Sequence, residues 1–260
     1  MKWDVSLLDQ NMSAWFAVDL QGTELKGLWV YLIMVRVLAV NGSVRMGKGY
    51  TAKVLAPFLD GMRDAGAFVE SVYARSLKLE PCRGDLFCWY EKPGKCYLYD
   101  DMQILYPKLR EADVLVLATP VYMPLPGEMQ NFLNRLVCLI QPDLVWQGGR
   151  TRARFRDDVK IKKIVLVGVC GWFEFFNFGT VVRIARELAK NVGVEFAAPV
   201  LRPHASHLDK DNDKTRAVME ALRKAGSELV KSGDVSKELL DLVGQPLISE
   251  EEYKKGLRVE

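Results

Sequence analysis

The chain has 260 residues, of which 49% are hydrophobic and 27% are charged, and these shares are typical of a folded globular protein rather than a disordered one. Lysine and arginine (36) exceed aspartate and glutamate (33) by only three, so no general basic field argues for binding to nucleic acid or to an anionic membrane surface. A chain of this length accommodates one substantial α/β domain or two small ones.

Five cysteines, an odd number, occur in a chain without a recognisable signal peptide. This argues against a disulfide framework and predicts a reducing compartment, so we expect a cytoplasmic protein. The membrane-like stretch at residues 28–40 contains Arg36 and is shorter than the roughly 20 apolar residues that a membrane span needs. We therefore expect neither nucleic acid nor a membrane as a partner.

From residue 35 onward, apolar runs alternate with amphipathic stretches. Runs rich in Val, Leu or Ile predict strands that are buried on both faces, at residues 35–40, 68–73, 113–118, 161–169 and 194–201. Apolar residues that recur every three or four positions predict helices at residues 51–65, 102–111, 128–140, 180–191 and 214–231. This alternation predicts an α/β protein with a doubly wound, five-stranded parallel sheet and helices on both faces.

Three segments lie outside this alternation of strands and helices. Residues 1–33 have no clear period, and we expect either an extension packed on the domain or sequence upstream of a start at Met34. The domain itself is expected at residues 34–245, followed by a C-terminal tail at 246–260. Residues 77–99 form a connection far longer than the about two to six residues of an ordinary βα loop, and they hold three of the five cysteines.

Residues 141–158 form a basic, irregular stretch that contains two glycines and four arginines. We expect a solvated loop or a subunit contact here. Binding to nucleic acid is the less favoured alternative, because the chain as a whole is close to neutral.

The first predicted strand is followed by a glycine-rich loop at residues 41–51 that leads into a helix. Its glycines permit close backbone approach, the hydroxyls of Ser43 and Thr51 can bond phosphate oxygens, and Arg45 supplies positive charge. The helix N-terminus adds free N–H groups, so the loop predicts a phosphate site at the carboxyl edge of the sheet. It matches neither the Walker loop nor the Gly-x-Gly-x-x-Gly fingerprint. The alternative is a glycine-rich turn that binds nothing.

Loops after the next two central strands carry groups that suit a flat ring. Residues 118–127 contain three prolines, which fix the backbone, together with Tyr122 and Met123. Plain loop packing is the alternative for this segment. Residues 168–179 contain four Phe and one Trp, too many for a solvated loop, so we expect contact with a ligand, a second subunit or the N-terminal extension.

These motifs together resemble the NADPH-dependent FMN reductase family, and in particular its iron-sulfur flavoprotein-like branch. The motifs that carry the resemblance are Gly42-Ser43-x-Arg45, Gly49-x-Thr51-Ala52, Pro81-Cys82, Cys88-Trp89, Gly94-Lys95-Cys96, Asp100-Asp101-Met102, Pro120-Val121-Tyr122 and Phe132-Leu133-Asn134-Arg135. The resemblance implies a flavodoxin-like fold with non-covalently bound FMN, and with NAD(P)H as the electron donor. It also implies a homodimer or homotetramer that completes the flavin site across an interface.

The resemblance implies a cofactor site built from three loops. The residues implied for the FMN phosphate are Ser43, Arg45, Tyr50 and Thr51. Those implied for the isoalloxazine ring are Pro120, Val121, Tyr122 and Met123, with Gly171 and Trp172 from the following loop. No catalytic side chain is required, because the flavin carries the chemistry.

The cysteine loop departs from the family pattern. Cluster-bearing relatives have four cysteines in a compact series, whereas this chain has Cys82, Cys88 and Cys96 with Asp85 where the second would fall. A four-iron cluster normally takes four thiolates. We expect Cys138 to face the core, so the sequence does not favour a bound cluster and we assign no metal ligands.

The sequence thus predicts an FMN-dependent oxidoreductase that passes electrons to a small-molecule or protein acceptor. The alternative is a non-enzymatic flavin-binding electron carrier or partner-docking module with a degenerate iron-sulfur site. Two further expectations concern single motifs. Asp100 and Asp101 are expected to cap a helix, and His204 and His207 are expected to be surface histidines, since no cysteine or acidic ligand pattern accompanies them.

Overall fold

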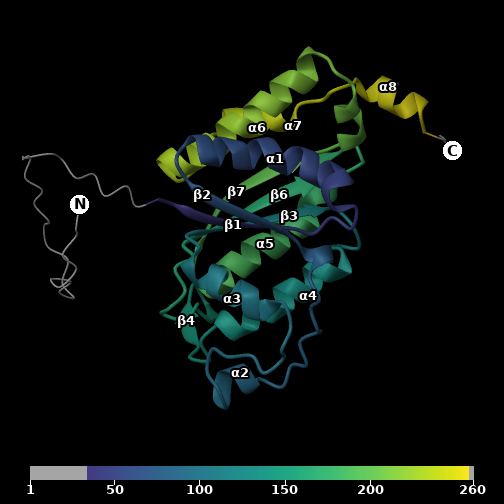
Figure 1. Cartoon of the computed structure of the whole chain (residues 1–260). Helices are drawn as coiled ribbons and strands as arrows, with labels where there is room; N and C mark the ends of the chain where they lie inside the picture. Colours follow the sequence, from purple (N-terminus) through teal and green to yellow (C-terminus); the bar gives the residue numbers. More distant parts are fainter. Residues whose placement is uncertain (1–33, 258–260) are drawn as a thin grey trace, which may run out of the picture. The chain divides into compact units, whose positions relative to one another are not determined.

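The computed structural model describes residues 34–257, so the predicted extension at residues 1–33 lies outside the described residues. Five parallel strands form the main sheet in the order β2-β1-β3-β6-β7 (Figure 1). Their bounds are Arg36–Asn41 for β1, Phe68–Tyr73 for β2, Val114–Pro120 for β3, Lys163–Val169 for β6 and Glu195–Arg202 for β7. This is the flavodoxin-like strand order, and it confirms the predicted fold class.

The central strands β1, β3 and β6 are buried almost throughout, as their uninterrupted apolar sequences predict. The prediction is wrong for β2, where no residue is fully buried and Phe68 is 46% exposed. The physical reason is position, because β2 is an edge strand that the flanking helices cover incompletely.

Helices cover the two faces of the sheet in two separate groups (Figure 1). One face carries α1 (Tyr50–Asp64), α6 (Asp213–Ser232) and α7 (Lys237–Gly244). The other carries α3 (Met102–Glu111), α4 (Gly127–Arg135) and α5 (Gly179–Val192). The helix predicted at residues 128–140 becomes a 3₁₀ turn at its end, η3 (Leu136–Leu139).

Several short elements were not predicted. The basic stretch contains a hairpin of β4 (Val145–Gln147) and β5 (Arg150–Arg152), and the cysteine loop contains α2 (Phe87–Tyr90). Other short elements are η1 (Met46–Lys48), η2 (Ala74–Ser76), η4 (Phe175–Phe178), η5 (Ala205–Asp209) and α8 (Glu250–Lys255). No helix within residues 34–257 has the length and apolar character required to cross a membrane.

Helices α1 and α6 approach each other closely through two glycines. A Cβ on Gly61 would lie 1.8 Å from the carbonyl oxygen of Arg223, and one on Gly226 would lie 1.9 Å from the carbonyl oxygen of Phe58. Both neighbours are backbone atoms, so neither can move aside by a rotamer change. The contact matters for the site because α1 begins directly after the predicted phosphate loop.

Arg202 and His204 fix the chain beyond α7 to the end of β7. Arg202 is completely buried and donates to the carbonyl oxygens of Val243 (2.6 Å) and Gln245 (2.9 Å). His204 Nε2 accepts from the backbone N–H of Leu247 at 3.0 Å. The expectation of a surface histidine is therefore wrong for His204, which is 1% exposed, because the C-terminal segment covers it.

The burial of His204 predicts a specific loss of stability in acid. Burial, followed by the charge of Arg202, lowers the pKa of His204 to about 4, from about 6.5 in an unfolded chain. Below pH 6.5 the imidazole of His204 binds a proton in the unfolded state but not in the folded state. The free energy of unfolding therefore falls between pH 7 and pH 4. The expected loss from this group is about 3 kcal/mol.

Urea titrations at a series of pH values check this prediction. The His204→Asn variant should lack this contribution, so the stability difference between wild type and variant should shrink as the pH falls from 7 to 4. The His207→Asn variant serves as the control and should keep the wild-type slope. A constant difference between wild type and His204→Asn across this range would contradict the assignment.

Candidate functional site

The predicted site residues lie on loops at one edge of the sheet. The strands β1, β3 and β6 are in register, so their carboxyl ends meet at this edge. Backbone hydrogen bonds connect the loops that follow, from Gly42 N to Ala118 O (2.7 Å) and from Val121 N to Val169 O (2.8 Å). This is the edge at which open α/β sheets bind their ligands.

The loop between β1 and α1 forms a compact cradle. Asn41 Oδ1 accepts from the backbone N–H of Ser43 at 2.9 Å and so fixes the start of the loop. Ser43 and Thr51 are both nearly buried, and a Cβ on Gly49 would lie only 2.5 Å from Ser43 Oγ. Only glycine leaves this hydroxyl room beside the start of α1.

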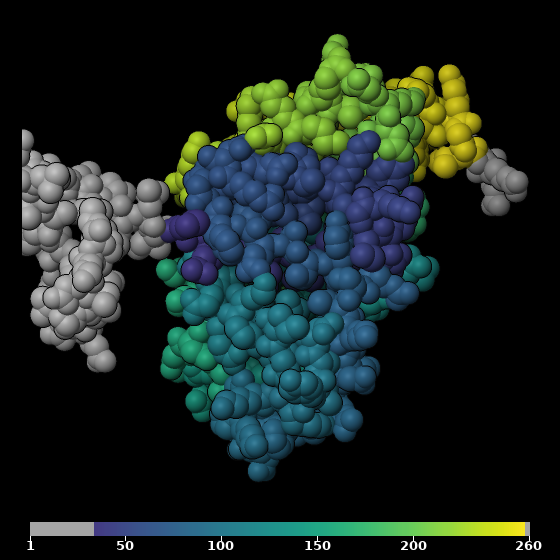
Figure 2. Space-filling model, viewed as in Figure 1, coloured from purple at the N-terminus to yellow at the C-terminus, as the bar shows by residue number. Residues whose placement is uncertain are grey.

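The N-terminus of α1 provides free donors. Within residues 34–257, the backbone N–H groups of Tyr50 and Thr51 have no hydrogen-bond acceptor, as expected for the first turn of a helix. Together with the helix dipole they favour an anion at this position. In Figure 2, α1 and the loop before it lie at the surface of the described part of the chain.

Tyr50 has a partner that the sequence did not indicate. Its hydroxyl donates to Asp209 in η5, and this hydrogen bond is the main reason why the pKa of Tyr50 is raised. Lys53 also pairs with Asp209 at 3.0 Å. The side chain of Tyr50 therefore joins α1 to η5, and its backbone N–H is the group that faces the cradle.

The proline loop packs beside the cradle. A Cβ on Gly42 would lie 2.8 Å from Cβ of Met129, at the start of α4, directly after this loop. Pro120 and Val121 are half-buried, whereas the side chains of Tyr122 (65%) and Met123 (93%) are exposed. The loop thus presents an aromatic and a polarisable side chain at the edge of the sheet.

Some aromatic side chains of the loop after β6 pack inside the protein, and others are exposed. Phe173 stacks on His204 with a ring-centroid distance of 5.0 Å, and Phe178 is buried. Trp172 and Phe176 are exposed, with Gly171 and Trp172 at the same edge as the cradle. Phe173 also packs against Tyr253 of α8, with ring centroids 5.3 Å apart. The C-terminal segment was not among the expected partners of this cluster, because nothing in the sequence of the cluster indicates that distant segment.

Comparison with known families identifies the family of the chain. A family model described as NADPH-dependent FMN reductase matches residues 35–172, which is more than half of the chain. The chain belongs to this family. The matched residues include the cradle (residues 41–51), the cysteine loop (77–99), the proline loop (118–127) and the start of the aromatic loop (168–179).

Individual relatives agree with membership of the NADPH-dependent FMN reductase family. An iron-sulfur flavoprotein from Methanosarcina thermophila is 27% identical over 106 residues, covering 40% of this chain and 54% of that protein. An iron-sulfur flavoprotein from Archaeoglobus fulgidus is 33% identical over 108 residues, covering 41% and 53%. The chain thus spans about half the length of the curated relatives it matches.

Solved structures share the fold of this family. An NAD(P)H:quinone oxidoreductase from Methanothermobacter marburgensis superposes with a TM-score of 0.51 at 19% identity, covering 75% of this chain and 96% of that one. An FMN-dependent NADH-azoreductase from Bacillus anthracis in complex with FMN gives 0.53 at 12% identity, covering 76% and 100%. At these identities the similarity shows the fold alone.

FMN is the cofactor of the family, and the residues of the cradle fit its phosphate. Two features of the cradle support this fit. Gly49 leaves space beside Ser43 Oγ, and the backbone N–H groups of Tyr50 and Thr51 have no acceptor within residues 34–257. Arg45 is exposed on the same loop. Its positive charge opposes the rise in the pKa of Tyr50 and contributes to the lowered pKa of Asp209. The site offers donors and positive charge to a phosphate.

The cysteine loop does not fit the four-thiolate cluster of the iron-sulfur flavoprotein branch. Asp85, at the position of the missing cysteine, accepts hydrogen bonds from the backbone N–H of Phe87 (3.1 Å) and the hydroxyl of Tyr97 (2.8 Å). Among residues 34–257 no three His, Cys, Asp or Glu side chains are arranged to hold a metal ion. The proposed chemistry therefore uses no cluster.

A buried ion pair beside this loop was missed by the sequence analysis. Asp100, expected as a helix cap, accepts from the backbone N–H of Met102 at 3.0 Å, but its main partner is Arg135. The side chain of Arg135 is 1% exposed, and it also donates to Glu80 O at 2.7 Å. The sequence signal was Arg135 within the helix predicted at residues 128–140, because an arginine needs an acidic partner when it is buried.

Proposed function

We propose that the protein is an FMN-dependent oxidoreductase that takes electrons from a reduced nicotinamide and passes them to a small-molecule or protein acceptor. The observation that carries this proposal is the cradle at the N-terminus of α1, at the edge of a flavodoxin-like sheet in a chain of the NADPH-dependent FMN reductase family. The activities named for the relatives support the class of chemistry and leave the acceptor open.

The residues of the cradle would hold the FMN phosphate. Ser43 and Thr51 would donate from their hydroxyls, Tyr50 and Thr51 from their backbone N–H groups, and Arg45 from its guanidinium. Bound FMN supplies the redox chemistry, accepting electrons from the donor and releasing them to the acceptor. The protein's part is to hold the phosphate, orient the ring and leave one ring face open to both reactants.

The ring would lie against the proline loop. Pro120 and Val121 are held by the sheet edge, where Val121 N donates to Val169 O, so their backbone groups are fixed for hydrogen bonding to the ring. Tyr122 and Met123 would contact its face, with Gly171 and Trp172 on the side of the next loop. The exposure of Tyr122, Met123 and Trp172 also supports the proposal of a homodimer or homotetramer that covers this edge.

Anaerobic reduction of the FMN-loaded protein tests the proposed activity. NADPH or NADH should bleach the visible flavin band, and an added quinone or azo compound should restore it. If both nicotinamides leave the flavin oxidised while a one-electron protein donor reduces it, the nicotinamide reductase proposal is wrong and the protein is an electron carrier.

The Arg45→Ala substitution tests the phosphate assignment. Loss of a charge-assisted contact should weaken FMN binding by about 1.5–3 kcal/mol, or roughly 10- to 150-fold in Kd. Fluorescence titration of the apoprotein with FMN measures the change. Arg63→Ala is the matched control, because Arg63 lies in the last turn of α1, at the end away from the cradle, and pairs with Asp60. Equal FMN affinity in wild type and Arg45→Ala would remove Arg45 from the site.

A further inference from the structure

Four of the five cysteines line one cavity, on the side of the sheet that carries α3 and α4. The cavity has a volume of about 300 Å³, and Cys82, Cys88, Cys96 and Cys138 all contribute to its wall. Cys82, Cys88 and Cys96 belong to the cysteine loop, whereas Cys138 comes from η3, after α4. The expectation that Cys138 faces the core is correct in that it is buried, but it also meets the cysteine loop.

The backbones that carry Cys88 and Cys138 are fixed against each other. The guanidinium of Arg156 donates to both of their carbonyl oxygens, to that of Cys88 at 3.0 Å and to that of Cys138 at 3.2 Å. Trp89 Nε1 also donates to Val137 O at 2.9 Å. One arginine and one tryptophan thus join α2 to η3 on both sides of the two cysteines.

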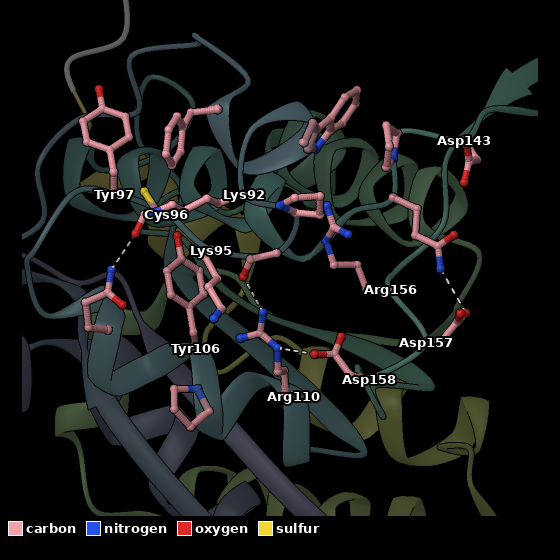
Figure 3. Close-up of a pocket in the computed structure, with 18 residues that line it drawn as sticks. Lys92, Lys95, Cys96, Tyr97, Tyr106, Arg110, Asp143, Arg156, Asp157 and Asp158 are labelled. Carbon is pink, nitrogen blue, oxygen red and sulfur yellow. Dashed lines mark hydrogen bonds and ion pairs between the residues drawn. The ribbon is translucent and has the colours of Figure 1, made fainter.

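Cys96 has different contacts. Cys96 Sγ accepts from Arg135 Nη2 at 3.5 Å, and its carbonyl oxygen accepts from Gln103 (Figure 3). Within residues 34–257 the cysteines do not gather into a set of three metal ligands. Cys88 and Cys138 are instead joined through their backbones by Arg156.

We propose that Cys88 and Cys138 form a reversible dithiol–disulfide pair that links the cysteine loop to the end of α4. All five cysteines are free in this structure. The two thiols share a cavity wall, and Arg156 holds their backbones together.

The pKa values of the two thiols shift in opposite directions. Hydrogen bonding with Cys138, followed by burial, raises the pKa of Cys88. The same hydrogen bond lowers the pKa of Cys138 against the opposing effect of burial. Thiolate character therefore develops on Cys138, and the thiolate is the nucleophile in such reactions.

Hydrogen peroxide is an oxidant that balances the reaction. The Cys138 thiolate attacks one peroxide oxygen, an S–O bond forms, the O–O bond breaks, and the leaving hydroxide takes a proton to become water. The Cys88 sulfur then attacks Cys138 Sγ, the S–S bond forms, the S–O bond breaks, and the second hydroxide leaves as water with the Cys88 proton. Two thiols lose two electrons and one peroxide becomes two waters. A small dithiol reverses the change by thiol–disulfide exchange.

Cys138 lies just after the C-terminal end of α4, and the N-terminal end of α4 follows the proline loop. Helix α4 has nine residues, or about 13 Å at 1.5 Å per residue, and runs from Gly127 to Arg135. A larger cavity of about 1000 Å³, lined in part by Cys96, Tyr106, Arg110 and Arg156, adjoins the cysteines (Figure 3). In Figure 2 the cysteine loop forms the end of the described body opposite α6.

Thiol counting and disulfide mapping on the full chain test the proposal. Under denaturing conditions the reduced protein should show five thiols, and protein treated with stoichiometric hydrogen peroxide should show three, with five restored by dithiothreitol. Non-reduced peptide mapping should recover a Cys88–Cys138 link. Cys138→Ser should keep four thiols after peroxide, and Cys88→Ser should form no disulfide, because an oxidised Cys138 then lacks its partner. Cys82→Ser, the matched control from the same cavity, should fall from four thiols to two.

Mapping the wild-type chain keeps the test valid if a serine variant does not fold. Five thiols retained after peroxide, a disulfide that joins other cysteines, or sulfinic acid without any disulfide would each overturn the proposal. The proposal would also be overturned if anaerobically purified protein contained iron and acid-labile sulfide, and if Cys88 and Cys138 became reactive only after the iron and sulfide were released. The two thiols would then be metal ligands. None of these outcomes depends on nicotinamide oxidation, so the result is independent of the proposed function.

Discussion

Replacing Gly226 by alanine is expected to destabilise the protein by about 3 kcal/mol or more, the upper range for overpacking of a core. The added Cβ would lie 1.9 Å from the carbonyl oxygen of Phe58, 2.9 Å from its carbonyl carbon and 3.1 Å from the backbone nitrogen of Met62. All three atoms belong to the backbone of α1, so the helices must separate. Because the cradle lies at the start of α1, FMN binding should weaken as well. Urea unfolding, with the midpoint and slope fitted separately, measures the loss of stability.

Gly179→Ala is the matched control for Gly226→Ala. Gly179 is also helical, at the start of α5, but a Cβ there would meet no atom within 4 Å. Alanine is the better helix former, so this variant should be neutral or more stable by up to about 1 kcal/mol. A loss below about 1 kcal/mol for Gly226→Ala would mean that α1 and α6 are not packed as closely as described.

Replacing Arg135 by methionine should cost about 3–5 kcal/mol, because it leaves the Asp100 carboxylate buried without its cation. Burial alone would raise the pKa of Asp100, but hydrogen bonds from Arg135 and from the backbone N–H groups of Glu80 and Met102 outweigh it and lower the pKa. The side chains of both partners are almost fully buried, at 1% and 5% exposure. Solvent therefore cannot screen the remaining charge.

Two comparisons show whether the buried pair is the cause of this loss. Arg216→Met removes an arginine whose ion pairs with Asp211 and Asp213 are exposed, and it should cost less than about 1 kcal/mol. The double variant Arg135→Met with Asp100→Asn should recover part of the stability, since it no longer buries an unpaired charge. A double variant less stable than Arg135→Met alone would contradict this account of the pair.

The sequence predicted the sheet well because its signal is local. Each central strand is an apolar run long enough to be recognised without its neighbours, and the glycine-rich loop and the proline loop follow β1 and β3 directly. Since parallel strands end at one edge, their order along the chain already placed Ser43, Arg45, Thr51 and Pro120 together. The role of each of these residues in holding FMN stays a prediction.

The features that were missed depend on contacts between distant segments. His204 is buried by Leu247 and its neighbours, 43 residues further along, so its own sequence surroundings suggested only a loop. Tyr50 meets Asp209, and Cys138 meets Cys88 through Arg156, again without any local pattern. The edge strand β2 shows the opposite error, since an apolar run alone does not reveal how completely helices cover it.

The identity of the bound cofactor tests the central claim most directly. The visible absorption spectrum of anaerobically purified protein should show the two bands of a flavin, and heat should release a compound that co-chromatographs with FMN in a ratio near one per chain. A colourless protein that also fails to bind added FMN would contradict the account, and the cradle at the start of α1 would then be a glycine-rich turn without a ligand.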